Sequence, residues 1–180
     1  NMTSGGGREN TWDSQNRLYE CMIGTDKTRF TYGPDGLRRS MTVHYGAGNE
    51  ATTHYLLEGQ NVVQEGHLAG NNFVADVTYG MGLRGIEYRE DSGGLKWYIY
   101  DGLGSVVAEV DDGASQDGDA VVTRNPEVDV YGNASTTPAK HGFVGGLGHV
   151  TDGTGLMYMR ARYYDPAVGR FVSEDPAGDG

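Results

Sequence analysis

Short stretches in which apolar and polar residues alternate recur along the chain, and glycine-containing turns separate them. Alternation with a period of two is typical of strands that bury one face. The apolar residues show no helical period, and Gly recurs too often for a helix longer than about ten residues. The pattern therefore predicts an all-β protein of antiparallel hairpins, with its clearest strands at residues 29–32, 42–45, 96–100 and 121–124.

The hairpins form an internal repeat, and each unit is marked by an aromatic residue followed by a turn. We expect the aromatic residue to end a strand, Asp, Asn or Pro to start the turn, and Gly or Asn to supply a positive φ angle. Successive markers lie 20 to 24 residues apart as far as Tyr100, a spacing that fits one hairpin per unit. A degenerate copy lies at residues 128–133, and the markers are Trp12, Tyr32, Tyr55, Tyr79, Tyr100 and Tyr164.

The composition agrees with many short strands around a small aliphatic core. Of 180 residues, 30 are Gly and 12 are Tyr, and only 37% are hydrophobic. The net charge of −11 argues against nucleic acid and anionic membranes as partners, because their phosphates attract Lys and Arg. There is no run of ~18 apolar residues, so we predict no membrane-spanning segment. The single Cys21 excludes an internal disulfide and a cysteine-based zinc site.

Two groups of residues have metal-binding side chains but lack the spacing of a metal site. The unit after Tyr100 is longer than the others, and its excess falls at Asp111–Asp119, which we interpret as a lengthened hairpin tip. These carboxylates could bind Ca²⁺, but a solvated acidic tip is the simpler interpretation. His141 and His149 flank a glycine-rich turn, and no third ligand is spaced with them, so we expect loop residues. We therefore predict no metal and no cofactor.

The end of the chain carries the most specific motif. Residues 155–178 contain Ala-Arg-Tyr-Tyr-Asp-Pro, then Gly-Arg-Phe, then Asp-Pro-Ala-Gly. With the aromatic-turn repeats before it, this stretch resembles the YD repeats and the repeat-associated core of the Rhs family. Residues 103–108 and 143–146 resemble further family stretches. The sequence departs from the family where Gly follows Tyr32 and Tyr79 and Leu follows Tyr55, so the turns need not all be of one type.

The resemblance implies a long antiparallel β-ribbon that coils into a hollow shell. It divides the chain into hairpin repeats at residues 1–139 and a core-like closing part at residues 140–180. Shells of this family are far longer, so the chain resembles the C-terminal end of a shell or a small relative, and its first residue, Asn1, also suggests a piece of a longer protein. Exposed strand edges favour association with the rest of a longer chain or with identical copies.

The resemblance also suggests a chemistry. Some members release a C-terminal toxic region by aspartyl-protease-like self-cleavage, in which two close carboxylates share a proton. Asp175 matches the Asp-Pro-x-Gly of the core, and Asp179 matches a second acidic position beyond it. The core arginines, which could steady such carboxylates by paired hydrogen bonds, are Arg160, Arg162 and Arg170.

A purely structural interpretation accounts for the same residues. Asp165 and Asp175 precede Pro and can start turns, and the core arginines can stack on neighbouring aromatic rings. In this interpretation Asp165 and Gly169 belong, with the aromatic markers, to the repeat structure. The family's cleavage site lies downstream of the last residue of this sequence.

These observations leave three functions open. The preferred one is a structural β-shell or scaffold, exported or displayed on the cell surface, that encloses or presents a C-terminal cargo or toxin. The second is a self-cleaving terminal module of a toxin-delivery protein. The third is a glycan-binding or cell-wall-binding module, or a filament-forming subunit, because tyrosine-rich sheet faces can bind other molecules. We expect no enzyme activity in this piece alone.

Overall fold

The protein is an open antiparallel β-ribbon in which the strands follow one another in sequence order. The computed structural model describes residues 1–44, 48–111 and 119–175. Each strand of the larger sheet pairs with its neighbours in sequence, and β1 and β12 form the two edges. These strands are β1 (Ser4–Gly5), β2 (Arg8–Trp12), β3 (Leu18–Ile23), β4 (Asp26–Tyr32), β5 (Arg38–His44), β6 (Glu50–Glu58), β7 (Asn61–Ala69), β8 (Asn72–Gly82), β9 (Gly85–Asp91), β10 (Gly94–Tyr100), β11 (Val106–Asp111) and β12 (Val121–Arg124).

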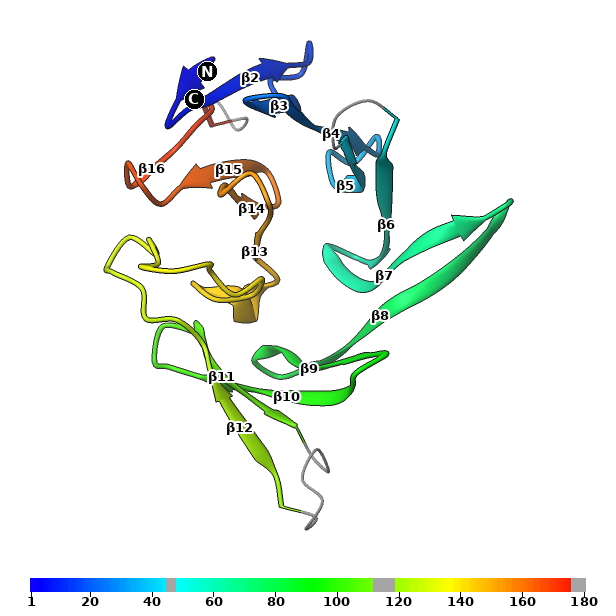
Figure 1. The fold of residues 1–180 in the computed structure, drawn as a ribbon, viewed down its shortest axis with the longest axis vertical. Helices are drawn as coiled ribbons and strands as arrows, with labels where there is room; N and C mark the ends of the chain where they lie inside the picture. Colours follow the sequence, from blue (N-terminus) through cyan, green and yellow to red (C-terminus); the bar gives the residue numbers. More distant parts are fainter. Residues whose placement is uncertain (45–47, 112–118, 176–180) are drawn as a thin grey trace.

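A second, smaller sheet lies within the curve of this ribbon. Figure 1 shows β1 to β12 following a C-shaped path, and the chain then turns back through the opening to meet its own first strands. We call residues 140–175 the closing segment. Its elements are the short 3-10 helix η1 (Gly145–Leu147) and the strands β13 (Val150–Thr151), β14 (Met157–Met159), β15 (Arg162–Asp165) and β16 (Arg170–Phe171).

The all-β prediction is confirmed, and the predicted strands coincide with β4, β5, β10 and β12 wherever the structure describes them. Apart from the three-residue η1, the described residues form no helix. They accordingly contain no helix with the length and apolar character needed to cross a membrane. The polar alternation of the sequence thus gives a sheet with one face toward the closing segment and one face toward solvent.

One five-residue turn recurs along the chain and explains the repeat. The N–H of its first residue donates to the carbonyl of the fifth, and the N–H of the fourth donates back to the carbonyl of the first. When the first residue is Asp, its carboxylate also accepts the N–H two residues later. This additional bond fixes the turn locally. The turns of this kind begin at Asp13, Asp101, Asp129 and Asp152, and their fourth residues, all with positive φ, are Asn16, Gly104, Gly132 and Gly155.

The turn survives where Gly replaces Asp at its first position. Gly33 donates to the Leu37 carbonyl at 2.9 Å, and Gly36 donates back to Gly33 at 3.0 Å. Asp35, two residues into the turn, supplies the carboxylate and accepts the Leu37 N–H at 3.1 Å. The backbone pattern therefore needs the positive φ angle of Gly36 more than it needs Asp at the first position.

The prediction that each aromatic marker ends its strand is wrong for Tyr55 and Tyr79, and wrong by one residue for Tyr164, which Asp165 follows in β15. Tyr55 lies inside β6, which continues to Glu58, and Tyr79 lies inside β8, which continues to Gly82. The reason is the length of the turn that follows, because only Gly59 and Gln60 separate β6 from β7, and two residues also separate β8 from β9. Short turns let the strands run further than the five-residue turns do.

The main apolar core lies between the first strands and the closing segment. Leu18, Cys21 and Phe30 of the ribbon pack with residues of the closing segment, so the core forms only when the chain has returned to its beginning. Burial raises the pKa of the Cys21 thiol to about 11, which keeps it protonated at neutral pH. The closing segment contributes Leu156, Tyr158, Tyr163 and Val172 to this core.

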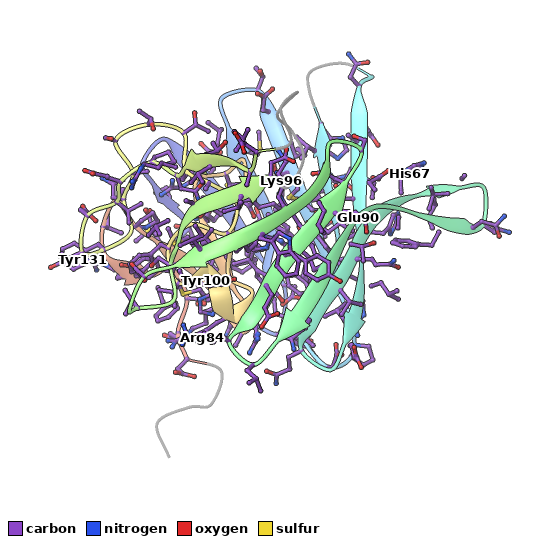
Figure 2. All side chains as sticks on the ribbon, turned by 90° about the horizontal axis from the view of Figure 1, so that it is seen from below. His67, Arg84, Glu90, Lys96, Tyr100 and Tyr131 are labelled. Atoms are coloured by element: carbon purple, nitrogen blue, oxygen red, sulfur yellow. The ribbon has the colours of Figure 1, made fainter. Side chains whose placement is uncertain are left out.

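Away from the closing segment, part of the ribbon projects as a two-stranded hairpin. β6 pairs with β7 only as far as Gly66, and β9 pairs with β8 only from Thr78 onward. Figure 2 shows His67 on this projection, and its imidazole lies 2.9 Å from the carboxylate of Asp76 across the hairpin. The inner side of the curve is therefore occupied by the closing segment, whereas this hairpin extends away from it.

Candidate functional site

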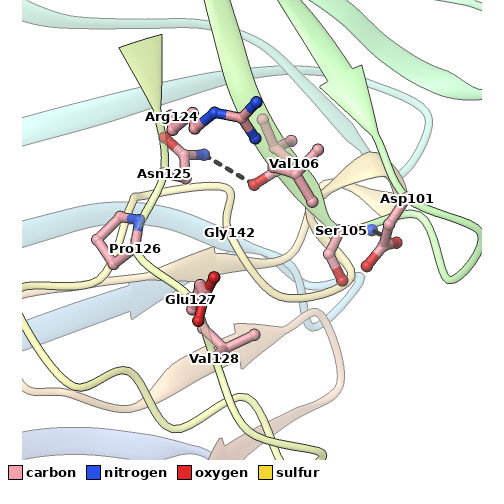
Figure 3. Close-up of a pocket in the computed structure, with 10 residues that line it drawn as sticks. Asp101, Ser105, Val106, Arg124, Asn125, Pro126, Glu127, Val128 and Gly142 are labelled. Atoms are coloured by element: carbon pink, nitrogen blue, oxygen red, sulfur yellow. Dashed lines mark hydrogen bonds between the residues drawn. The ribbon is translucent and has the colours of Figure 1, made fainter.

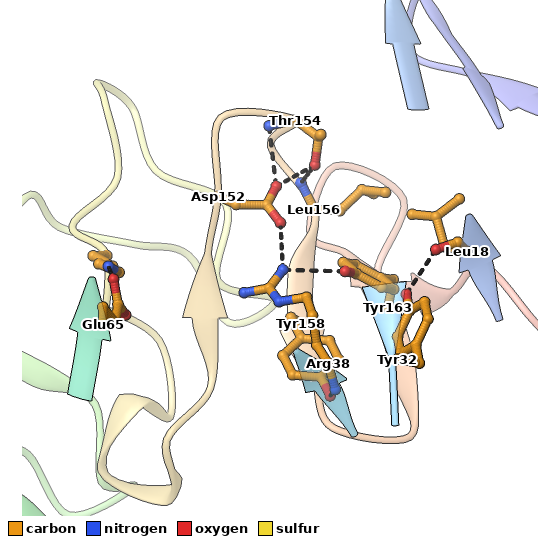
Figure 4. Close-up of polar contacts among 10 residues, drawn as sticks. Leu18, Tyr32, Arg38, Glu65, Asp152, Thr154, Leu156, Tyr158 and Tyr163 are labelled. Carbon is orange, nitrogen blue, oxygen red and sulfur yellow. Dashed lines mark hydrogen bonds and ion pairs between the residues drawn. The ribbon is translucent and has the colours of Figure 1, made fainter. Parts of the chain in front are cut away.

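A buried arginine joins the ribbon to the closing segment. Arg38, the first residue of β5, is only 3% exposed, and its Nη1 donates at 3.1 Å to both Asp152 Oδ2 and Tyr163 Oη (Figure 4). The guanidinium carbon lies 4.3 Å from the ring centre of Tyr158 and 4.8 Å from that of Tyr55. A guanidinium tolerates burial when a carboxylate and aromatic faces surround it.

Local structure places both partners of this ion pair. Asp152 begins one of the five-residue turns, so its Oδ1 accepts the Thr154 N–H at 3.1 Å while Oδ2 is left for Arg38. Arg38 directly follows the turn at residues 33–37, and its own N–H donates to Tyr158 Oη at 2.9 Å. Burial also raises the pKa of Tyr158 and of Tyr163, so both hydroxyls stay protonated. The repeat turns thus position a charge-balanced contact across the inner side of the curve.

A second polar cluster lies further along the closing segment. Glu65 of β7 is 5% exposed, accepts the Tyr79 hydroxyl at 3.0 Å and pairs with Lys140. Beside it, His141 is 4% exposed and its Nδ1 lies 3.2 Å from the Tyr98 hydroxyl. Burial, helped by the positive charge of Lys140, lowers the pKa of His141 to about 3. The ring is therefore neutral at physiological pH.

The two ends of the described chain also meet. Arg8 of β2 pairs with Asp165, which is 1% exposed, and Arg8 Nη1 donates to the Thr154 carbonyl at 3.4 Å. The Met2 N–H donates to the Val172 carbonyl at 2.8 Å. Ion pairs between the ribbon and the closing segment therefore occur at β2, at β5 and at β7.

One cleft lies beside each of two contacts between the ribbon and the closing segment. One of about 430 Å³ lies beside Arg38 and is lined by Tyr55, Glu65, Lys140 and Asp152 among others. The other, of about 370 Å³, lies beside the turn that begins at Asp101 (Figure 3). There the Asn125 side chain donates to the Val106 carbonyl at 2.8 Å.

The buried ionisable groups of these clusters are either paired or neutral. The hydroxyls of Tyr55, Tyr79 and Tyr98 have pKa values raised by burial, and the pKa of His141 is too low for it to act as a base near neutral pH. The described ranges, 1–44, 48–111 and 119–175, hold no group of three or more His, Cys, Asp or Glu arranged for a metal. Most of the predicted acidic tip, 112–118, lies outside these ranges.

Those residues predicted for self-cleavage that the structure describes contact different parts of the molecule. Asp175 pairs with Arg162 at 3.1 Å and is exposed, while Asp179 lies outside the described residues. Arg162 also stacks on Phe171, with the guanidinium carbon 3.7 Å from the ring centre. Arg160 instead donates to Asn61 and to the Leu147 carbonyl, at 2.9 and 2.8 Å. Arg170, the last of the predicted residues, lies exposed in β16.

The repeat-structural residues each contact another part of the molecule. Asp165 accepts the Ala167 N–H at 3.0 Å and the Gly169 N–H on its carbonyl at 2.9 Å, with Gly169 at φ 66°. These bonds form the turn that was the structural alternative for Asp165. Side chains of most aromatic markers bond to the backbone or side chain of a neighbouring element: Trp12 to Met2, Tyr32 to Leu18, Tyr79 to Glu65, Tyr100 to Ile86 and Tyr164 to Tyr131, while Tyr55 stacks on Arg38.

Sequence reasoning missed the two buried clusters. Arg38 was visible only as part of a repeat unit, and Lys140 only as the first residue of the closing part. A signal for Asp152 was present, because Asp152-Gly153-Thr154-Gly155 has the pattern of the other Asp turns. No comparable signal marks Glu65, whose burial depends on Tyr79 and Lys140.

The architecture is that of an open β-ribbon with its own closing segment on the inner side, and known proteins contain it. No protein-family model matches the sequence. The chain is 33% identical over 186 residues to the tRNA3(Ser)-specific nuclease WapA of Bacillus spizizenii, covering 98% of this chain and 7% of that protein. It is also 33% identical over 195 residues to the tRNA nuclease WapA of Bacillus subtilis, with the same coverage.

Solved structures share the fold. A crystal structure of a TcdB2–TccC3 complex matches with a TM-score of 0.70 at 22% identity, over 98% of this chain and 9% of that one. The Tc holotoxin pore of Photorhabdus luminescens matches with a TM-score of 0.67 at 21% identity, over 98% and 9% of the two chains. The chain therefore spans less than a tenth of the proteins it resembles. The matched pore structure is that of a Tc holotoxin, and the sequence relatives are named as tRNA nucleases; these matches agree in part with the resemblance drawn from the sequence.

Proposed function

We propose that this chain is a non-enzymatic wall module of an Rhs-type β-shell in a toxin polypeptide. In this proposal the ribbon forms part of the wall, and the closing segment fixes the curvature of the wall from inside. The observation that carries it is the buried contact between Arg38 and Asp152, which joins β5 to the closing segment across 114 residues of sequence.

The pairing pattern supports a wall that is part of something larger. All the strands of the ribbon pair in sequence order, so hairpins can be added or removed without changing the topology. The similarity to WapA and TccC3 chains that are more than ten times longer supports the same interpretation. A location outside the cell or on its surface, and the presentation of a cargo beyond Asp175, are parts of this proposal.

The experiment is cryo-electron microscopy of the natural polypeptide that carries this chain. We expect a hollow shell whose wall includes β1 to β12, with the closing segment ordered on the inner side. In an Asp152→Ala variant, the density of the closing segment should weaken, because Arg38 loses its carboxylate.

Asp129→Ala is the matched control, since Asp129 begins the same kind of turn but is exposed and has no buried arginine. A compact particle without an internal cavity, or a filament, would contradict the shell. An equal effect of the two substitutions on the closing segment would show that the turn, rather than the ion pair, holds it.

A further inference from the structure

A cleft larger than either of those above opens where the turns of the ribbon meet the closing segment. It measures about 640 Å³, and its walls come from the turns at residues 13–17 and 33–37, from Gln60, and from residues 159–161. It shares no lining residue with the cleft beside Glu65 and Lys140. Its lining includes Arg17, Asp35, His149 and Arg160.

Arg160 is a fixed cation in this cleft. Its guanidinium donates to Gln60 Oε1 at 3.3 Å, to Asn61 Oδ1 at 2.9 Å and to the Leu147 carbonyl at 2.8 Å. All three acceptors are neutral, and Arg160 forms no ion pair within the described part of the chain. Three of its five N–H donors are thus used to hold the group in place, and the others remain for a ligand.

The other charged residues of the cleft are already balanced. Arg17 pairs with Asp13 at 2.7 Å, and Asp35 pairs with Arg39 at 2.6 Å. Burial, together with the neighbouring Arg160, lowers the pKa of His149, so this ring adds no positive charge at neutral pH. The cleft therefore keeps one uncompensated positive charge in a protein whose net charge is −11.

The backbone conformation of Arg160 supports a role for its side chain in this cleft. Arg160 has φ 60°, a left-handed conformation that is uncommon for residues other than Gly and costs free energy. It occupies the tight connection between β14 and β15, where Gly or Asn would be the usual choice. The conformation aims a long cationic side chain back across the turns of the ribbon.

We infer that this cleft binds a carboxylate group of a peptide, with Arg160 as the residue that pairs with it. Both hydrogens of Nη2 are already used, so the two remaining donors, Nε–H and one Nη1–H, diverge, and a carboxylate would accept one charge-assisted hydrogen bond from Arg160. The amide side chains of Gln15 and Gln60 and the backbone of residues 34–37 line the same space and suit a peptide. A nucleic-acid backbone presents a row of phosphates and needs several unpaired cations, whereas Arg17 is already paired and Arg160 supplies one. This inference does not depend on the proposed shell function.

The test uses the 180-residue chain and two synthetic peptides, acetyl-Gly-Glu-Gly-Glu-Gly-amide and its glutamine counterpart, titrated by calorimetry. We expect the glutamate peptide to bind and the glutamine peptide to bind about tenfold more weakly, as for loss of a charged hydrogen bond. Higher salt should weaken binding of the glutamate peptide because the site is partly open to solvent.

Arg160→Asn should reduce binding of the glutamate peptide to the level of the glutamine peptide, since Asn tolerates the left-handed conformation but has no charge. Arg84→Asn is the control, because Arg84 is exposed and lines a different cleft, and its loss changes the net charge equally (Figure 2). Equal binding of the two peptides to the unmodified chain would overturn the inference, even if Arg160→Asn failed to fold. Unchanged binding by a folded Arg160→Asn, or tighter binding of inorganic phosphate than of the glutamate peptide, would overturn it as well.

Discussion

The closing segment contacts the first half of the ribbon, β1 to β7, and the second half, β8 to β12, in different ways. Against β2 and β5 it places the buried pairs of Arg8 with Asp165 and Arg38 with Asp152, beside the apolar core. Against β9 to β11 it places the neutral ring of His141 and the glycines of η1, which touch the ribbon backbone. Directional charged contacts demand a partner at one position, whereas glycine contacts demand the absence of a side chain.

The comparison indicates how the two halves tolerate change. In the first half, removing one residue of an ion pair leaves a buried charge unpaired. This lowers the free energy of unfolding more than replacing both residues of the pair by apolar ones. In the second half, adding a single methyl group would separate surfaces that now touch. Gly146 donates to the Gly104 carbonyl at 2.9 Å, so a shift of η1 would also break a hydrogen bond. The first half is thus sensitive to loss of a group, and the second half to gain of one.

The largest loss of folding stability is expected for Asp152→Ala. It leaves the guanidinium of Arg38 buried without a carboxylate and should lower the free energy of unfolding by about 3–5 kcal/mol. Urea denaturation of the variant against the parent protein measures the change. The double variant Arg38→Met with Asp152→Ala should recover part of the loss, because no buried charge then remains.

The control for this first prediction is Asp129→Ala, which removes the carboxylate from the same kind of turn without leaving a buried charge unpaired. It should cost about 1 kcal/mol, the usual contribution of a hydrogen bond. If Asp152→Ala cost no more than Asp129→Ala, the charged contact would not distinguish the first half of the ribbon.

A smaller loss is expected for Gly85→Ala in the second half. A Cβ atom at Gly85 would overlap the carbonyl oxygen of Gly146, whereas one at Gly94 would meet nothing within 4 Å. Both glycines have positive φ, 108° and 100°, so Gly94→Ala shares the backbone strain and lacks the overlap. We expect Gly85→Ala to cost about 1–3 kcal/mol more than Gly94→Ala in thermal or urea unfolding. Equal losses would mean that η1 can move away freely.

The sequence predicted the local part of this arrangement and little of the long-range part. The alternation, the Asp residues and the glycines predicted the strands and turns, because each depends on neighbours within a few residues. The pairing of Arg38 with Asp152 spans 114 residues and follows from the path of the whole ribbon. His141 was expected in a loop, where it does lie, but its burial against Tyr98 depends on β10.

The residues predicted for self-cleavage also show that long-range contacts are hard to predict from sequence. Family resemblance grouped Asp175 with three arginines; the structure pairs Asp175 with Arg162, while Arg160 bonds to Asn61 and Arg170 lies exposed in β16. Arg160 is directed elsewhere by its φ of 60°. A motif thus specified residue types and spacing, whereas backbone conformation decided which of the side chains meet.

The smallest change in folding stability should be a pH dependence of the free energy of unfolding that is caused by His141. Its pKa is about 3 in the folded protein against 6.5 for a free histidine, so the unfolded state takes up the proton first as pH falls. The contribution of the neutral ring is complete above pH 6.5 and is lost as the pH falls from there toward 3. Between pH 6.5 and 5, protonation of this histidine in the unfolded state should remove roughly 1.5 kcal/mol of stability.

The control is His141→Gln, which keeps a hydrogen-bonding partner for Tyr98 but cannot be protonated. The carboxylates are common to both proteins. The free energy of unfolding of each protein is measured by urea denaturation as a function of pH. Subtracting the values of the His141→Gln variant from those of the parent gives the contribution of the histidine. A difference that stays constant across this range would show that the imidazole is reached by water when the ribbon is folded. The second half of the ribbon would then be held less tightly by the closing segment than the first.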